Sequence, residues 1–366
     1  MAVIDLDSHL REGYFMDEVF KLDGPFAEYT PVRVGNGQCQ HAKFQHRLDV
    51  EDRDAAKRFS HNYVYDPDDH RGWDEIAERQ VGGWDMERRV ADNRTEGIDH
   101  QMIFPTGISI PTQYPGEVGA ALARAYNDWV AKLVRGNEDR LWPVAMAPAG
   151  HPEAMADELR RAVKELGFKA GHLVVYTKDR TMNDPVFDPY YAAAQELDVP
   201  LFCHPNTLGD LINRFDSFFP QHVLGRPLNC VAALVALVCG GVFERFPNLR
   251  VCFFEVSAEF PLYWMHRMDC DYAWSQREPR SRTAELSMAP SEYVRRNCYF
   301  TCEADEPDIG RALKEIPAEH VLMATDYPHF DSEWPHTVAG IRERDDITDR
   351  QKKLILEDNP AQLLNL

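Results

Sequence analysis

The chain has 366 residues, of which 44% are hydrophobic and 27% are charged, and its formal net charge is −20 at pH 7. This is an ordinary globular composition with enough apolar residues for a large core, in one large domain or two smaller ones. So acidic a balance disfavours nucleic acids and anionic membranes as partners, because both attract basic surfaces.

The first predicted strand covers residues 3–6, and it runs into Asp7, Ser8 and His9. Successive side chains of a strand point to opposite faces, so the alternation predicts that Asp5, Asp7 and His9 share one face. These groups are either hydrogen-bonded polar residues of the core or ligands that converge on a positive charge. The rest of the chain decides between the two interpretations.

A long excursion follows the first strand. Residues 11–80 carry several prolines, glycines and charges and show no clear strand or helix of the repeating kind. Loops longer than about 15 residues inside a compact domain are usually functional or disordered. The aromatic residues of this segment favour a packed lid or an interface, inserted into a single domain that spans residues 1–366.

Strands and helices then alternate along the chain. Predicted helices at 83–96, 117–134 and 152–166 lie between apolar strands, and Gly167 is placed to end the last of these helices. The further predicted strands are 98–105, 141–148, 171–176, 199–205, 249–256, 299–303 and 320–329. Nearly continuous apolar strands that alternate with helices indicate a parallel sheet covered on both faces. Eight such units predict an α/β fold, the (β/α)8 TIM barrel. A doubly wound open sheet is the alternative, but no G-x-G-x-x-G follows any strand.

Ionisable side chains stand where several of the predicted strands end. They are Asp7 and His9 after the first strand, His204 after the fifth, Glu255 after the sixth and Asp326 after the eighth. In a barrel these strand ends meet at one mouth, where active sites lie. Carboxylates and imidazoles converging in an apolar barrel are costly unless something neutralises them. A divalent metal ion does so, and this donor set suits zinc, manganese or iron better than magnesium or calcium.

The chain carries no marks of export or membrane insertion. No basic stretch followed by an apolar run precedes the first strand, and the longest apolar run, residues 231–242, is shorter than the roughly 18 residues needed to cross a bilayer. The 8 cysteines show no C-x-x-C spacing, and several lie in apolar runs. We therefore expect free thiols and a cytoplasmic location.

The motifs resemble those of the amidohydrolase superfamily, in the branch that includes aminocarboxymuconate semialdehyde decarboxylase and γ-resorcylate decarboxylase. The resemblance covers most of the chain outside residues 11–80. It rests on the segments 4–9 (IDLDSH), 166–169, 183–190, 199–205 (VPLFCHP), 240–249, 325–329 (TDYPH) and 357–361. It implies a single divalent metal ion held by Asp7, His9, His204 and Asp326. The absence of a lysine within the fourth strand, from which a two-metal site would take its bridge, agrees with one ion.

Two positions depart from the pattern of that branch. Asp7 stands where many members have histidine, which makes the site richer in oxygen. Glu255 stands where many of its decarboxylases have a catalytic histidine, and it either donates the proton itself or orients a ligand from behind. His329 and His222 are the other candidates for the catalytic acid. In hydrolysis, a carboxylate such as Asp326 or Glu255 would take the proton of the attacking water. His172 lies early in its strand, where a role in the core or at the bottom surface is expected.

The resemblance also implies the activity. We predict a metal-dependent, decarboxylase-like lyase that acts on a small aromatic or unsaturated carboxylic acid. Hydrolysis of an amide, a lactone or a C–C bond by a metal-activated water is the alternative, because both reactions use the same ligands. Arg226 and Arg214 are candidates for binding the substrate anion, and Phe104 and Trp334 for stacking on the substrate. A homodimer or a higher homo-oligomer is expected from the resemblance.

Overall fold

A computed structural model gives the fold of the chain. It describes residues 2–11, 80–106, 114–175, 177, 179–205, 214–215, 218–278 and 284–366, with short pieces at 19, 22, 24–29, 32–33 and 39–40. The short pieces include the turn η2 (Gly24–Tyr29) and two antiparallel strands, β3 (Val32–Arg33) and β4 (Cys39–Gln40). Most of the predicted insertion at 11–80 therefore lies outside the described residues, and its role as a lid or an interface stays a prediction.

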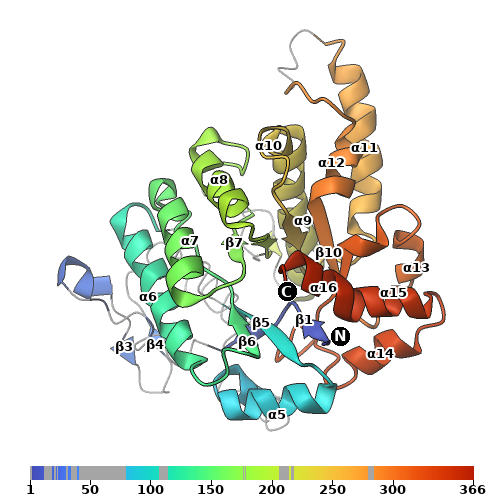
Figure 1. Ribbon diagram of the computed structural model, residues 1–366. Helices are drawn as coiled ribbons and strands as arrows, with labels where there is room; N and C mark the ends of the chain where they lie inside the picture. The colour runs from blue at the N-terminus through green and yellow to red at the C-terminus, as the bar shows by residue number, and fades with distance from the viewer. Residues whose placement is uncertain are drawn as a thin grey trace.

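The described residues contain the eight predicted strands, and they form a closed parallel barrel (Figure 1). In chain order these are the split first strand β1 (Ile4–Asp5) and β2 (His9–Leu10), then β5 (His100–Pro105), β6 (Leu141–Pro143), β7 (Gly171–Leu173), β8 (Leu201–Cys203), β9 (Val251–Phe253), β10 (Cys298–Cys302) and β11 (Val321–Met323). Each strand pairs with the next, a bridge between Ala145 and Gly171 joins β6 to β7, and a bridge between Ser8 and Tyr327 joins the last strand to the first. The TIM barrel is thus confirmed, and the open sheet is wrong.

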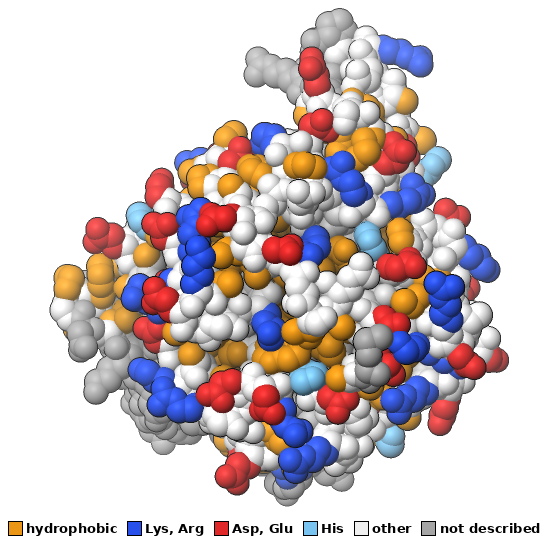
Figure 2. Space-filling view, in the orientation of Figure 1, with side chains coloured by type: hydrophobic (Ala, Val, Ile, Leu, Met, Phe, Trp, Pro, Cys, Tyr) orange, Lys and Arg blue, Asp and Glu red, His pale blue; other side chains and the backbone are white. Residues whose placement is uncertain are grey.

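Helices surround the barrel (Figure 1). They are α5 (Met86–Glu96), α6 (Glu117–Leu133), α7 (Pro152–Leu166), α8 (Asp188–Leu197), α9 (Phe218–Cys239), α10 (Val242–Arg245), α11 (Phe260–Ser275), α12 (Pro290–Asn297), α13 (Ile309–Ala312), α14 (Thr337–Glu343), α15 (Asp349–Lys353) and α16 (Asn359–Leu363). Short turns η3 (Val81–Gly83), η5 (Pro185–Phe187), η7 (Ala318–His320) and η8 (Leu354–Asp358) adjoin them. On the face shown in Figure 2, acidic and basic side chains are interspersed over this helical layer.

Local signals account for the ends of the helices. Helix α7 has the predicted bounds, and Gly167 follows it at φ 77°, a left-handed conformation that glycine adopts at little cost. Helix α5 begins three residues later than predicted, because the Asp85 carboxylate accepts a hydrogen bond from the Arg88 amide (3.0 Å) and so caps its first turn.

The apolar core has two parts. Inside the barrel, inward side chains such as Met102, Phe202 and Leu322 pack together, and Leu363 and Leu364 at the end of the chain join this cluster. The larger part lies between the strands and the helices around them. Two-sided burial explains why the strands read as continuous apolar runs in the sequence.

Helix α9 is longer than the apolar run that the sequence suggested. By length and composition alone its residues 219–239 could cross a membrane, and 56% of the most apolar window is buried within the protein. Cys230, Leu234 and Leu237 are fully buried in the core between barrel and helices. The same helix carries Arg226 in ion pairs with buried carboxylates. Its apolar residues are thus used to cover the barrel.

The first strand contains a bulge that places the site. Asp5 pairs with Gln101 and His9 pairs with Phe104, so strand one holds one more residue than β5 between these pairs. Ile4 and Leu6 point into the barrel and Asp5 points outward, whereas beyond the bulge Asp7 and His9 face inward. The prediction that Asp5 shares a face with Asp7 and His9 is therefore wrong, because the extra residue breaks the alternation.

The outward side of this strand is held by a buried polar network. The Asp5 carboxylate accepts hydrogen bonds from the side chains of Gln101 (2.8 Å) and Thr325 (2.6 Å) and from the Thr325 amide (3.0 Å). Arg89 of α5, fully buried, donates to Ser8 Oγ (2.9 Å), to Gln101 Oε1 (2.8 Å) and to the carbonyl of His9. Burial raises the pKa of Asp5 to about 7. The network fixes the backbone of strand one against its two neighbours.

Removing the Arg89 guanidinium should destabilise the protein. We expect Arg89→Leu to lower the free energy of unfolding by about 3 kcal/mol, because several buried acceptors lose their charged donor at once. Urea unfolding with circular dichroism measures it. Arg94→Leu, on the exposed face of the same helix, is the matched control and should stay within about 0.5 kcal/mol of the parent. Equal stability of the two variants would show that the network is not needed.

Candidate metal centre

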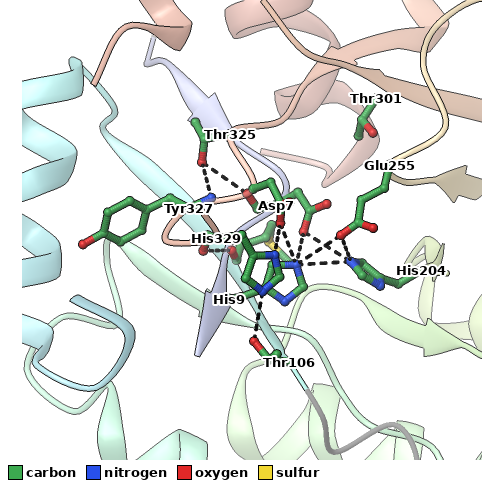
Figure 3. Close-up of polar contacts among 12 residues, drawn as sticks. Asp7, His9, Thr106, His204, Glu255, Thr301, Thr325, Tyr327 and His329 are labelled. Atoms are coloured by element: carbon green, nitrogen blue, oxygen red, sulfur yellow. Dashed lines mark hydrogen bonds and ion pairs between the residues drawn. The ribbon is translucent and has the colours of Figure 1, made fainter. Parts of the chain in front are cut away.

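Five ionisable side chains from four strand ends meet at the barrel mouth (Figure 3). The Nε2 atom of His9 lies 3.2 Å from Asp7 Oδ1, 3.2 Å from Asp326 Oδ1 and 3.2 Å from His204 Nε2. Glu255 Oε1 lies 3.1 Å from His204 Nε2 and 3.7 Å from His9 Nε2. The sequence prediction that these residues converge is therefore confirmed by the geometry.

The cluster is buried, and burial and neighbouring charges shift the pKa values of its members in different directions. Burial opposes the charge on His9, yet the carboxylates of Asp326 and Asp7 raise the pKa of the imidazole well above its usual value. Burial likewise opposes ionisation of Asp326, and the adjacent His329 and His9 hold its pKa well below the usual range. Burial raises the pKa of Asp7. Such a cluster is costly unless its charges are balanced.

The two carboxylate oxygens of Glu255 have different partners. Its Oε1 points at the two imidazoles of His204 and His9, and its Oε2 receives the Arg226 guanidinium at 2.6 Å. Burial opposes its ionisation, but Arg226 and His204 lower its pKa to about 2. A permanently ionised carboxylate is a poor proton donor, so this geometry favours a ligand or an orienting group over the predicted acid.

His329 lies directly against Asp326. The Thr106 hydroxyl donates to the carbonyl of Leu10 (2.6 Å), so at His329 Nε2, 3.2 Å away, it can only accept. Nε2 therefore carries a hydrogen, and Nδ1 lies 2.7 Å from Asp326 Oδ1. Burial lowers the pKa of this imidazole, and the Asp326 carboxylate opposes that shift. The ring of His329 also stacks on that of His9, with centroids 4.1 Å apart.

The backbone conformation orients two of the carboxylates, those of Glu255 and Asp326. Glu255 and Asp326 both adopt φ 55°, two and three residues after the ends of β9 and β11. This left-handed conformation costs a non-glycine residue about 1–2 kcal/mol, and such strain is retained mostly where function requires it. Hydrogen bonds between the first and last strands hold the turn at Asp326, whose amide donates to the carbonyl of Asp7 (3.0 Å).

The residues fit a divalent metal ion. Among the described residues, both carboxylate oxygens of Asp7 are buried without a hydrogen-bond partner, which is unusual unless a cation is the intended partner. The Nδ1 atom of His204 lies 2.9 Å from the carbonyl of Pro205, which leaves the Nε2 lone pair free to face the cluster. Imidazole and carboxylate donors together suit zinc, manganese or iron. Asp7, His9, His204 and either Asp326 or Glu255 could hold the ion.

The other predicted site residues lie at different distances from the ligand cluster. The Phe104 ring lies 5.1 Å from the ring of His204 and 5.9 Å from that of His9, as a wall of the site. His222 of α9 forms an ion pair with Asp331 (3.1 Å), and Asp331 pairs with Arg226. Two residues therefore separate His222 from the ligand cluster. Trp334 packs on Tyr327 and donates to the carbonyl of Asp92 in α5, away from the ligands.

The two predicted anion-binding arginines also differ. Arg226 is bound to Glu255 and lies 3.6 Å from Asp326 and 3.2 Å from Asp331, so carboxylates of the protein already surround it. Arg214 is exposed, in a short piece of the chain between residues that the structure does not describe. Substrate binding by either residue stays a prediction.

Two further ionisable groups lie in the interior, and sequence reasoning missed the first of them. Glu303 follows β10, and burial together with the charges of Asp326 and Glu255 raises its pKa to about 9. Its place at the end of a predicted strand was a usable signal. His172 alternates with the outward Gly171 and so points into the barrel, where burial lowers its pKa to about 3 and keeps it neutral. The expectation that it belongs to the core is thus confirmed, whereas a place on the bottom surface is wrong.

Comparisons with known proteins agree with this fold. The sequence pattern of the Amidohydrolase family matches residues 39–366. The chain is 24% identical to 2-amino-3-carboxymuconate-6-semialdehyde decarboxylase of Dictyostelium discoideum over 246 residues, which are 67% of either chain. It is 27% identical to the γ-resorcylate decarboxylase of a Polaromonas strain over 271 residues, 70% of this chain and 81% of that one.

Solved structures show the same fold. The crystal structure of 5-carboxyvanillate decarboxylase from Novosphingobium aromaticivorans, with manganese and 4-hydroxy-3-methoxy-5-nitrobenzoic acid bound, superposes with a TM-score of 0.77. The match covers 100% of this chain and 96% of that protein at 23% sequence identity. It supports the barrel architecture.

Loss of one ligand should weaken metal binding. We expect Asp7→Asn to raise the dissociation constant for Mn²⁺ by about 100-fold or more, since even residues behind the ligands typically contribute 10–100-fold. Calorimetric titration of the metal-free protein measures it. Asp128→Asn, a half-exposed carboxylate on α6, is the control and should bind Mn²⁺ as the parent does. Equal affinity of both variants would remove Asp7 from the site.

The buried acids at the end of β10 should make stability depend on pH. Burial raises the pKa of Glu306 to about 7 and that of Glu303 to about 9. A carboxyl whose folded pKa is raised contributes stability below its unfolded pKa and loses that contribution as pH rises through the folded pKa. The metal-free protein should therefore lose about 1 kcal/mol of unfolding free energy per pH unit between pH 7 and 9.

Urea unfolding across this pH range measures the loss. Glu303→Gln should flatten the slope above pH 7, because the variant has no proton to lose there. Glu315→Gln, on the exposed surface, should leave the slope unchanged. A slope that is the same in all three proteins would assign the pH dependence to other groups.

Proposed function

This chain belongs to the Amidohydrolase family, and we propose that it is a metal-dependent decarboxylase of a small aromatic or unsaturated carboxylic acid. The observation that carries the proposal is the convergence of Asp7, His9, His204 and Asp326 beside His329, whose Nδ1 atom lies 2.7 Å from Asp326 Oδ1. The similar proteins are named as decarboxylases of unsaturated or aromatic acids, which favours this reaction over hydrolysis.

Asp7, His9, His204 and Asp326 would hold one divalent ion, of zinc, manganese or iron. When bound, such an ion neutralises the cluster and acts as a Lewis acid towards oxygen atoms of the substrate, such as a carboxylate and a neighbouring hydroxyl. The residues around it supply orientation. Arg226 holds one oxygen of Glu255, so the other oxygen stays aimed at the imidazoles of His9 and His204.

The reaction needs a proton at carbon. In decarboxylation the ring carbon takes a proton, the bond to the carboxylate breaks, and its electron pair restores the conjugated system as CO2 leaves. In our proposal His329, whose Nδ1 atom lies 2.7 Å from Asp326 Oδ1, binds this proton and delivers it to the carbon. The Thr106 hydroxyl contacts Nε2 on the other side of the His329 ring and so holds the imidazole opposite the Asp326 carboxylate.

The wall of the site suits a flat substrate. Phe104 lies beside both ligand imidazoles and also packs against Phe202 and Phe254, so its ring is held in place. An aromatic or conjugated acid would stack on such a face while its carboxylate reaches the ligands. Glu255 being ionised, we assign it an orienting role and leave His222, paired with Asp331, outside the proton transfer.

The remaining features of the proposal come from the sequence. We propose a cytoplasmic enzyme that takes a small-molecule carboxylate substrate and forms a homodimer or a higher homo-oligomer. An amide substrate belongs to the hydrolytic alternative. The acidic net charge of −20 supports the expectation that nucleic acids and anionic membranes are not partners.

Release of CO2 tests the proposed reaction. The manganese-loaded protein, incubated with a panel of hydroxybenzoates, should release CO2 from at least one of them. Asp326→Asn should lower kcat by at least about 100-fold, because it removes both a ligand and the partner of His329. Asp331→Asn, which lies beside His222 and Arg226, is the control and should lower kcat by less than tenfold. Incorporation of 18O from labelled water into a product, without CO2, would establish hydrolysis and overturn the proposal.

A further inference from the structure

A second pocket lies outside the barrel mouth, between α11, α12 and the turn that follows α13. Its volume is about 430 Å³, which falls within the range of small-molecule sites. Leu262 and Met265 of α11 form an apolar wall, and Met265 is almost fully buried. Arg295 of α12 and Arg311 and Lys314 at α13 supply cationic groups on the other sides.

The three cations are held differently. The Arg295 guanidinium is fixed, since it donates to Ser291 Oγ (3.1 Å) and to the carbonyl of Glu315 (2.9 Å). Arg311 is 67% exposed and reaches Glu259 only at 3.5 Å. Among the described residues, the Lys314 ammonium has no ion-pair partner. The pocket is thus lined by one fixed guanidinium, that of Arg295, and by two cationic side chains that can move onto a ligand.

The acidic residues of the pocket offset this charge only in part. Asp269 accepts a hydrogen bond from the Ser291 amide (2.9 Å), so its charge is used at the first turn of α12. Glu315 is exposed and contributes its backbone carbonyl to Arg295. In a chain with a net charge of −20, a pocket in which cations outnumber carboxylates needs a reason.

We propose that this pocket binds a small organic carboxylate with an apolar body. The carboxylate would lie between Arg311 and Lys314, where charge-assisted hydrogen bonds are strongest, and the apolar body would cover Leu262 and Met265. The site is separate from the metal centre and does not rest on the function proposed for it.

A ligand in the pocket would affect the loop that carries Glu255. Glu259, the residue that competes for Arg311, immediately precedes α11, and the loop before it contains Glu255 at φ 55° and Ser257 at φ 67°. The amide of Ala258 in this loop donates to Glu306 (3.0 Å), which also accepts from the amide of Glu303. A ligand that draws Arg311 away from Glu259 therefore releases one tether of this loop.

Calorimetric titration with 4-nitrobenzoate tests the site on the manganese-loaded protein. If both proposals hold, the parent binds two equivalents per chain, one at the metal centre and one in the pocket. The double variant R311Q/K314Q should lose the pocket equivalent, by about tenfold or more in affinity for each cation removed. R267Q, an exposed arginine of α11 paired with Asp271 outside the pocket, is the control and should retain both equivalents.

Two further titrations examine the recognition itself. Glu259→Gln should tighten binding in the pocket severalfold, because it removes the carboxylate that competes for Arg311. The neutral analogue 4-nitrobenzamide should lose the pocket equivalent on the parent protein. Tight binding of the amide, or an unchanged affinity in Glu259→Gln, would overturn the assignment of Arg311.

The outcomes separate the two proposals. If the metal centre binds no benzoate, the parent shows one equivalent that R311Q/K314Q removes, and the pocket stands without the proposed function. If the parent and R311Q/K314Q bind the same number of equivalents with the same affinities, the pocket proposal is wrong, whatever the metal centre does.

Discussion

The structure depends on the burial of several opposite charges in one small volume. Asp7, His9, His204, Glu255 and Asp326 lie within hydrogen-bond or ion-pair reach of one another in a mouth with little access to water. Desolvation makes every unbalanced charge there expensive. A divalent cation together with the Arg226 guanidinium balances the three carboxylates while leaving the two imidazoles neutral. The rest of the fold can be understood as the frame that holds these donors in place.

That frame is built from backbone as much as from side chains. The bulge in strand one turns Asp7 and His9 inward, and the left-handed residues Glu255 and Asp326 turn their carboxylates towards them. Behind the strand, Arg89 and Asp5 connect its backbone to the neighbouring strands. Because these contacts are buried, they restrict the positions of the donor atoms more than loops alone would. A metal site with few ligands requires such fixed donor positions.

The sequence predicts the barrel and the donors well, for a physical reason. Strands buried on both faces carry an unmistakable apolar pattern, and polar residues that interrupt it at strand ends can meet only at the mouth. The orientation of Asp5 could not be predicted, since a bulge changes the face of a residue without changing the apolar pattern. The state of Glu255 depends on Arg226, 29 positions earlier in the sequence, and only the fold brings α9 over that strand end.

An anomalous-scattering map from crystals grown with Mn²⁺ tests the central claim most directly. The account predicts one peak per chain at the barrel mouth, about 2.0–2.3 Å from oxygen and nitrogen atoms of Asp7, His9, His204 and Asp326. The same map shows whether Glu255 lies at ligand distance or stays with Arg226. If the map shows no peak at the barrel mouth, whether or not Mn²⁺ is bound elsewhere in the crystal, it would contradict the metal centre and the decarboxylation proposed from it.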